Sequence, residues 1–85
     1  MKKYDVIVKW FEERGVKISD DSFDTDGIGC TWINATKDDL DLVVIVDADE
    51  YVFRAYDNIG DFEDIATRKT ENGILNQIRK YVTNI

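Results

Sequence analysis

The sequence predicts an α+β fold: a three-stranded antiparallel sheet with helices packed on one face, in the order α-β-β-β-α-α. Three observations favour this class. Apolar residues recur at helical spacing near both ends of the chain, β-branched and aromatic runs fill its middle, and short polar turns separate those runs. Strands that are joined by short turns pair antiparallel, and the flanking helices then cover one face of the sheet.

The first helix is expected over Lys3–Glu13, and Gly15 stands where a C-terminal cap belongs. Its apolar positions recur at helical spacing and are Tyr4, Ile7, Val8 and Phe11. After the helix we expect a short extended segment over 16–18, followed by a polar loop over 19–26.

Three strands are expected in the middle of the chain. In the first, over 29–35, Cys30 and Trp32 share one face because side chains alternate along a strand. The second, over 40–46, is apolar on both faces and is expected at the centre of the sheet. The third, over 51–56, is rich in aromatic and β-branched residues, which strands favour.

Two helices are expected to complete the fold. The shorter one, over 58–66, would direct Ile59, Phe62 and Ile65 inward. Thr70 is expected to cap the final helix. The apolar stripe of that final helix consists of Ile74, Leu75, Ile78, Tyr81, Val82 and Ile85.

The size of the chain limits what it can contain. Eighty-five residues predict a single small acidic domain over 1–85, with room for one core and no large cofactor, and we expect no cofactor. Cys30 is the one cysteine, so there is no internal disulfide, which fits a reducing compartment. The sequence lacks a run of 18 apolar residues and an apolar leader, so we expect a cytoplasmic protein without a membrane partner.

Acidic residues are concentrated in the middle of the chain. From Asp20 to Asp64 there are fourteen acids against two bases, Lys37 and Arg54, which is a net charge of −12 in 45 residues. The two ends of the chain are mildly basic, and the whole chain has a net charge of −7. Such a field attracts cationic partners and repels phosphates, so we expect no direct binding of nucleic acid.

The partner that this charge favours is a basic nucleic-acid-binding protein or nuclease. Carboxylates held on a sheet can occupy an Arg/Lys cleft that normally holds phosphates, because arginine pairs with both groups through two hydrogen bonds. The competing interpretation is that the acids only favour turns and keep a small protein soluble. The sequence leaves both interpretations open.

Two short motifs suggest metal chemistry. The stretch 22–27, Ser-Phe-Asp-Thr-Asp-Gly, resembles the start of a calcium loop, but the twelfth position is Ile33, where that loop needs a bidentate glutamate. We therefore expect an acidic loop there. Asp47-Ala48-Asp49 follows an apolar strand, as in the metal motif of glycosyltransferases, but the chain turns straight into another strand. We therefore expect a hairpin turn.

Catalysis is not expected. The chain has no histidine, and Cys30 has no candidate base near it in the sequence, so it is interpreted as a small core residue. The remaining alternative, a metal-dependent enzyme, would turn over a nucleotide or polynucleotide and would lose that activity in Asp24→Ala or Asp47→Ala.

The order of elements and the acidity together resemble one family. A helix ending near Glu13-Arg14-Gly15, a short 16–18 segment, three strands and then helices make the chain similar to the phage-encoded anti-CRISPR proteins that inhibit the RNA-guided nuclease of type II systems. The likeness covers most of the chain and includes no diagnostic motif. It implies a DNA mimic in the cytosol of a host cell, with a CRISPR effector as its partner.

This resemblance also implies which residues make the contact. They would be acids at the turns and in the segment after the third strand, namely Asp38, Asp39, Asp41, Asp47, Asp49, Glu50, Asp57, Asp61, Glu63 and Asp64. The leading alternative is an immunity or assembly subunit that binds through the apolar and aromatic face of the last helix.

Overall fold

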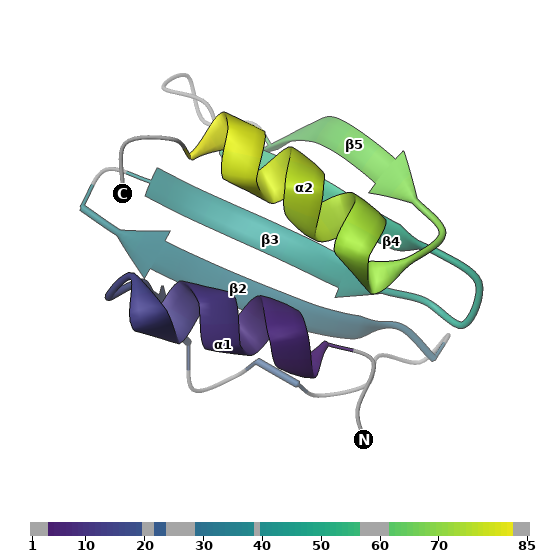
Figure 1. The fold of residues 1–85 in the computed structure, drawn as a ribbon, viewed down its shortest axis with the longest axis horizontal. Helices are drawn as coiled ribbons and strands as arrows, with labels where there is room; N and C mark the ends of the chain where they lie inside the picture. The colour runs from purple at the N-terminus through teal and green to yellow at the C-terminus, as the bar shows by residue number, and fades with distance from the viewer. Residues whose placement is uncertain (1–3, 20–21, 24–28, 39, 57–61, 83–85) are drawn as a thin grey trace.

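The protein is described by a computed structural model that covers residues 4–19, 22–23, 29–38, 40–56 and 62–82. The order of elements is α1 (Asp5–Glu13), β1 (Lys17–Ile18), β2 (Thr31–Lys37), β3 (Leu40–Val46), β4 (Tyr51–Tyr56), β5 (Phe62–Arg68) and α2 (Glu71–Tyr81). The five strands form one antiparallel sheet in the order β1-β2-β3-β4-β5 (Figure 1). The prediction of three strands and three helices is therefore wrong.

The largest correction concerns the short helix predicted over 58–66. The chain from Phe62 to Arg68 is strand β5, paired with β4 at the edge of the sheet, while residues 57–61 lie outside the described part. Ala66 pairs with Phe53 and Asp64 pairs with Arg54, so Ile65 is the extra residue of a β-bulge. A bulge shifts the alternation of side chains by one position, which hides the two-residue period of a strand.

The second correction concerns the segment after the first helix. Lys17 and Ile18 pair with Thr36 and Ala35, which makes β1 a fifth strand of the sheet. Gly15, with φ of +73°, ends α1 as expected, and the amide of Val16 donates to the carbonyl of Phe11 at 3.0 Å. This arrangement is a helix C-terminal motif that favours glycine in the left-handed region, and it turns the chain from α1 towards the sheet.

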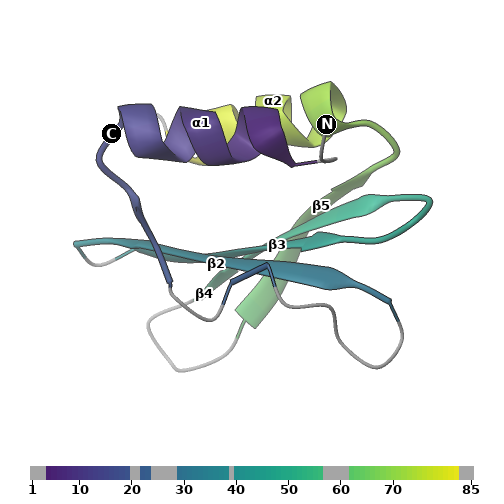
Figure 2. The ribbon, with the colours of Figure 1, turned by 90° about the horizontal axis from the view of Figure 1, so that it is seen from below.

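Both helices lie on the same face of the sheet (Figure 2). The core between the two layers includes side chains with no exposed surface, among them Ile7, Phe11, Phe53, Ile74 and Ile78. Burying each such side chain contributes about 1.5–3 kcal/mol to folding. One face of the sheet is therefore buried in the core beneath the two helices, and the other face carries no helix.

The final helix follows the sequence closely. Thr70 caps α2, because its hydroxyl oxygen accepts a hydrogen bond from the amide of Gly73 at 3.0 Å. Within its apolar stripe, Ile74, Leu75, Ile78 and Val82 are buried against the sheet, whereas Tyr81 is 43% exposed and its ring meets that of Phe53 edge-on. Ile85 lies outside the described residues. Neither α1 nor α2 has the length and apolar character needed to pass through a membrane.

Candidate binding surface on the outer face of the sheet

We call the sheet face opposite α1 and α2 the outer face. On β3, Leu42, Val44 and Val46 belong to the core beneath the helices, whereas Val43 and Ile45 belong to a separate cluster. Trp32, Val52 and Cys30 pack against Val43 and Ile45. Since side chains alternate along each strand, this second cluster forms the centre of the outer face. Cys30 is buried there, as the sequence predicted.

Arg54 connects the apolar centre to the acids. It shares a row of paired residues with Val43 on β3 and with Asp64 on β5. The Nε of Arg54 lies 2.5 Å from the Oδ1 of Asp64, and its guanidinium carbon lies 5.7 Å from the centre of the Trp32 ring. The side chains of Arg54 and Asp64 are 34% and 62% exposed, so the ion pair contributes at most about 1 kcal/mol. Its main effect is to hold Arg54 between an aromatic ring and a carboxylate.

The acids that the sequence singled out do not gather at one end of the sheet. Asp41 lies at the start of β3, whereas Asp47 and Glu50 lie beyond its end, in the turn to β4. Asp41 and Asp47 are six residue steps apart along an extended strand, which separates them by about 20 Å. Because hairpin turns alternate between the two ends of an antiparallel sheet, β4 returns the chain to the end where Asp41 lies. Asp64 lies on the edge strand β5, in the row of Arg54 and Val43.

The acids at the two ends nevertheless flank the same face. Asp41 alternates with the core residues Leu40 and Leu42, so it belongs to the outer face, and Asp64 lies beside Arg54 on that face. Asp47 and Glu50 form the next pair beyond the strands, with the amide of Asp47 donating to the carbonyl of Glu50 at 2.9 Å. Continuing the alternation by one residue places both on the outer side as well.

The other predicted contact residues are distributed differently. Asp38 and Asp49 are exposed in the two turns, and Asp38 has a positive φ of 53°. Glu63 pairs with the core residue Ala55, so alternation places it on the helix side at the sheet edge. The remaining three, Asp39, Asp57 and Asp61, lie outside the described residues.

Sequence reasoning missed two members of this surface. It did not assign a contact role to Trp32 or Arg54, although strand periodicity places both on the side away from the core, and Tyr56 lies on the same side of β4 as Arg54. Tyr56 is 42% exposed. The periodicity alone groups them, but only the register and the position of the helices show that this side faces away from the core.

The motifs that suggested metal chemistry have structural roles where the chain is described. The hydroxyl oxygen of Ser22 accepts a hydrogen bond from the amide of Asn34 at 2.9 Å, and Ile33 is fully buried. Asp24 and Asp26 lie outside the described residues. The turn at Asp47 is the expected hairpin turn, in which its Oδ1 accepts a hydrogen bond from the amide of Ala48. In the part of the chain that is described, no three His, Cys, Asp or Glu side chains are placed to hold a metal ion.

No family model matches the chain, and no curated protein or solved structure is detectably similar to it.

Proposed function

We propose that this protein is a non-catalytic, inhibitor-type binding protein that presents the outer face of its sheet to a basic, nucleic-acid-handling partner. One observation carries the proposal. Asp41 at one end of the sheet, Asp64 on the edge strand β5, and Asp47 and Glu50 at the other end flank a single face that neither α1 nor α2 covers.

Electrostatics explains how such a face would select its partner. The net charge of −7 attracts positively charged surfaces over several ångströms and speeds their association, most strongly at low salt. Short aspartate side chains on paired strands keep their carboxylates near fixed backbone positions, so an array of arginines that normally holds phosphates can pair with them. The partner proposed on this basis is a DNA- or RNA-binding protein, and a CRISPR effector is one example.

The centre of the outer face would supply contacts other than charge. Trp32 and Arg54 are partly exposed, and Tyr56 is exposed. Tryptophan, tyrosine and arginine are the residue types that contribute most often to the affinity of protein interfaces. A polar rim around an aromatic centre is also the usual arrangement of such interfaces.

A second candidate function uses the same face without charge complementarity. Trp32 on β2 and Val52 on β4 are partly buried at the centre of the outer face, so an apolar partner could pack there. On α2, Ile74, Leu75 and Ile78 are buried in the core, whereas Tyr81 at the end of the helix is 43% exposed. An immunity or assembly subunit would therefore bind through the centre of the sheet or through Tyr81.

Capture at low salt followed by two elutions separates these functions. The tagged protein is incubated with a bacterial lysate, and bound proteins are eluted with a salt gradient or with double-stranded DNA. Acidic mimicry predicts that a basic protein elutes in moderate salt and is displaced by DNA, because both ligands compete for the same arginines. An apolar interface predicts a partner that resists both elutions, and that result would contradict the proposal.

A further inference from the structure

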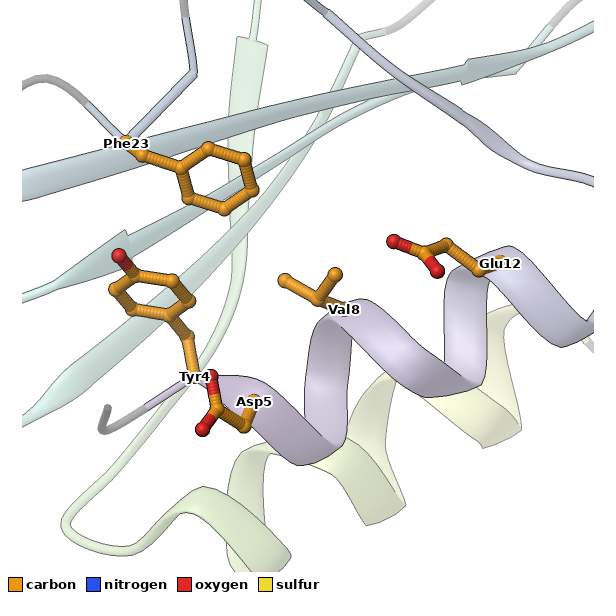
Figure 3. Close-up of a pocket in the computed structure, with 5 residues that line it drawn as sticks. All are labelled: Tyr4, Asp5, Val8, Glu12 and Phe23. Carbon is orange, nitrogen blue, oxygen red and sulfur yellow. The ribbon is translucent and has the colours of Figure 1, made fainter. Parts of the chain in front are cut away.

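A concave region lies between α1 and residues 22–23, separate from the outer face. It has a volume of about 400 Å³ and is lined by Tyr4, Asp5, Val8, Glu12 and Phe23. Figure 3 shows the rings of Tyr4 and Phe23 side by side at one end, Val8 in the middle and the carboxylate of Glu12 at the other end. The volume is within the range of small-molecule sites.

The aromatic wall of this pocket is held in place by the sheet. The rings of Tyr4 and Phe23 stack with their centres 5.1 Å apart and their planes 23° apart. Phe23 is 39% exposed and has a φ of +75°, which is unfavourable for a bulky side chain. Its amide donates a hydrogen bond to the carbonyl of Trp32 at 3.0 Å, so pairing with β2 fixes this backbone. The fold thus holds an exposed aromatic ring over α1 despite its conformational cost.

The carboxylates define the chemistry of the pocket. Asp5 and Glu12 are seven residues apart on α1, nearly two full turns, so they lie on the same side of the helix about 10 Å apart along its axis. Val8 lies between them on that side, and the ring of Tyr4 lies beside Asp5 at the end away from Glu12. An apolar and aromatic surface next to two anionic groups fits a ligand with an aliphatic body and positive charges, because cations are attracted both to carboxylates and to aromatic faces.

We propose that this pocket binds an alkylammonium or guanidinium group carried on an aliphatic chain, with Tyr4, Val8 and Phe23 contacting the chain and Asp5 and Glu12 facing the charges. Two sources share this chemistry: a free linear polyamine, and the side chain of a lysine or arginine in a protein. The proposal does not depend on the function assigned to the outer face, because the two surfaces share no residue.

Titration of the purified protein with matched probes tests the proposal. Hexamethylenediamine is compared with hexanediol, which has the same carbon chain without the charges, while the ring signals of Tyr4 and Phe23 are followed by NMR. We expect saturable shifts with the diamine and at least fivefold weaker binding of the diol. A capped peptide with one arginine between glycines forms the second arm, and the tighter of the two cationic probes indicates the source of the ligand. Equal shifts with the diamine and the diol, or no saturable shift with either cation, would overturn the proposal.

Two pairs of variants locate the binding on the molecule. Glu12→Gln should weaken diamine binding by about two- to fivefold, whereas Glu13→Gln, one residue further along the exposed surface of α1, should not change it. Phe23→Gly removes the ring and suits the positive φ, so it should fold and lose the saturable shift of Tyr4. Phe23→Asn also tolerates this backbone and serves the same purpose if the glycine variant is unstable. Equal effects of the two glutamine variants, or full binding by a folded Phe23 variant, would contradict the site.

Discussion

The carboxylate of Glu71 accepts a hydrogen bond from the backbone amide of Val6 at 2.8 Å, and the same oxygen accepts a second one from Ile7 at 3.1 Å. Helix α1 has no side-chain cap of its own, since Tyr4 precedes it without such a bond. The missing cap is supplied by the first residue of α2, far along the chain. In Figure 1 the two helices begin at the same end of the sheet and run side by side, so one carboxylate lies near the positive ends of both helix dipoles.

Glu71 is therefore expected to stabilise the packing of the two helices. Glu71→Ala leaves two helix amides without this acceptor and should lower the free energy of unfolding by about 1–2 kcal/mol. Glu71→Gln keeps an acceptor oxygen but no charge and should cause about half that loss. Urea denaturation measures both values. Glu13→Ala, at an exposed position of α1, is the control and should change the free energy by less than about 0.5 kcal/mol. A Glu71→Ala variant as stable as this control would exclude the capping role.

Tyr51 is expected to make the stability of the fold depend on pH in the alkaline range. Burial first, and the nearby charge of Glu71 second, raise the pKa of Tyr51 above the ordinary value of 10.0. The phenol thus holds its proton more tightly in the folded protein than in the unfolded chain. Its contribution to stability is complete below about pH 10 and is lost as the pH rises through the folded-state pKa.

We expect the stability difference between the wild type and Tyr51→Phe to shrink from neutral pH to about pH 11, because phenylalanine cannot lose a proton. Urea denaturation at several pH values measures this difference. Glu71→Gln should make the alkaline loss smaller but should not abolish it, since burial is the larger cause. A constant difference between the wild type and Tyr51→Phe would show that the phenol does not contribute to the alkaline loss.

Replacing Gly73 with alanine is expected to destabilise the protein, although helices usually favour alanine over glycine. A Cβ at this position would stand 2.9 Å from the hydroxyl oxygen of Thr70, its own cap, and 3.3 Å from the Cβ of Arg68. The Gly73→Ala substitution raises helix propensity, which stabilises α2 by up to about 1 kcal/mol. It also displaces the Thr70 cap, which contributes about 1 kcal/mol, and crowds Arg68 at the end of β5. Because these two effects nearly cancel, the crowding against Arg68 decides the sign, and we expect a net loss of about 1 kcal/mol. Asn76→Ala, at an exposed position of the same helix, should instead gain about 0.5 kcal/mol. Thermal unfolding shows whether the two alanines have opposite signs.

The elements that sequence patterns predicted best are those whose boundaries carry local signals. Strands β3 and β4 begin and end where the sequence placed them, because continuous apolar and aromatic runs end there in polar turns. Two residues likewise indicate helix ends: Thr70 caps the start of α2 with its hydroxyl group, and Gly15 adopts the positive φ that follows the end of α1. Strand β5 could not be predicted in this way. Its bulge at Ile65 breaks the two-residue period of a strand. Its stability also depends on pairing with β4 and packing against α2, and these are contacts between distant segments that a local sequence pattern does not show.

The candidate surface was predictable in its composition but not in its arrangement. The sequence shows that acids are concentrated in the turns, but antiparallel topology sends successive turns to opposite ends of the sheet. Whether those acids share a face depends on register and on which face the helices cover. Arg54 illustrates the difference. In the sequence it is one of two bases in an acidic segment, and in the structure it lies between Trp32 and Asp64 at the centre of the proposed contact.

Charge reversal on the outer face provides the most direct test of the proposed function, and the structure indicates which positions suit it. Asp38 has a positive φ, the Oδ1 of Asp47 holds the amide of Ala48, and Asp64 pairs with Arg54, so changes there would also perturb folding. Asp41 and Glu50 have no such role in the described structure and lie at opposite ends of the outer face.

Asp41→Lys combined with Glu50→Lys should weaken binding of the captured partner by at least about tenfold, since like charges then meet across the interface. The control is Glu13→Lys combined with Glu63→Lys, which makes the same change in net charge on the helix side of the molecule. Titration calorimetry in low and moderate salt compares the two variants, and their unfolding curves confirm that both are folded. Equal losses would mean that the net charge attracts the partner without a defined face. Full binding by the outer-face variant would place the contact elsewhere, because reversing an acid at each end of a true contact surface cannot leave its electrostatic match intact.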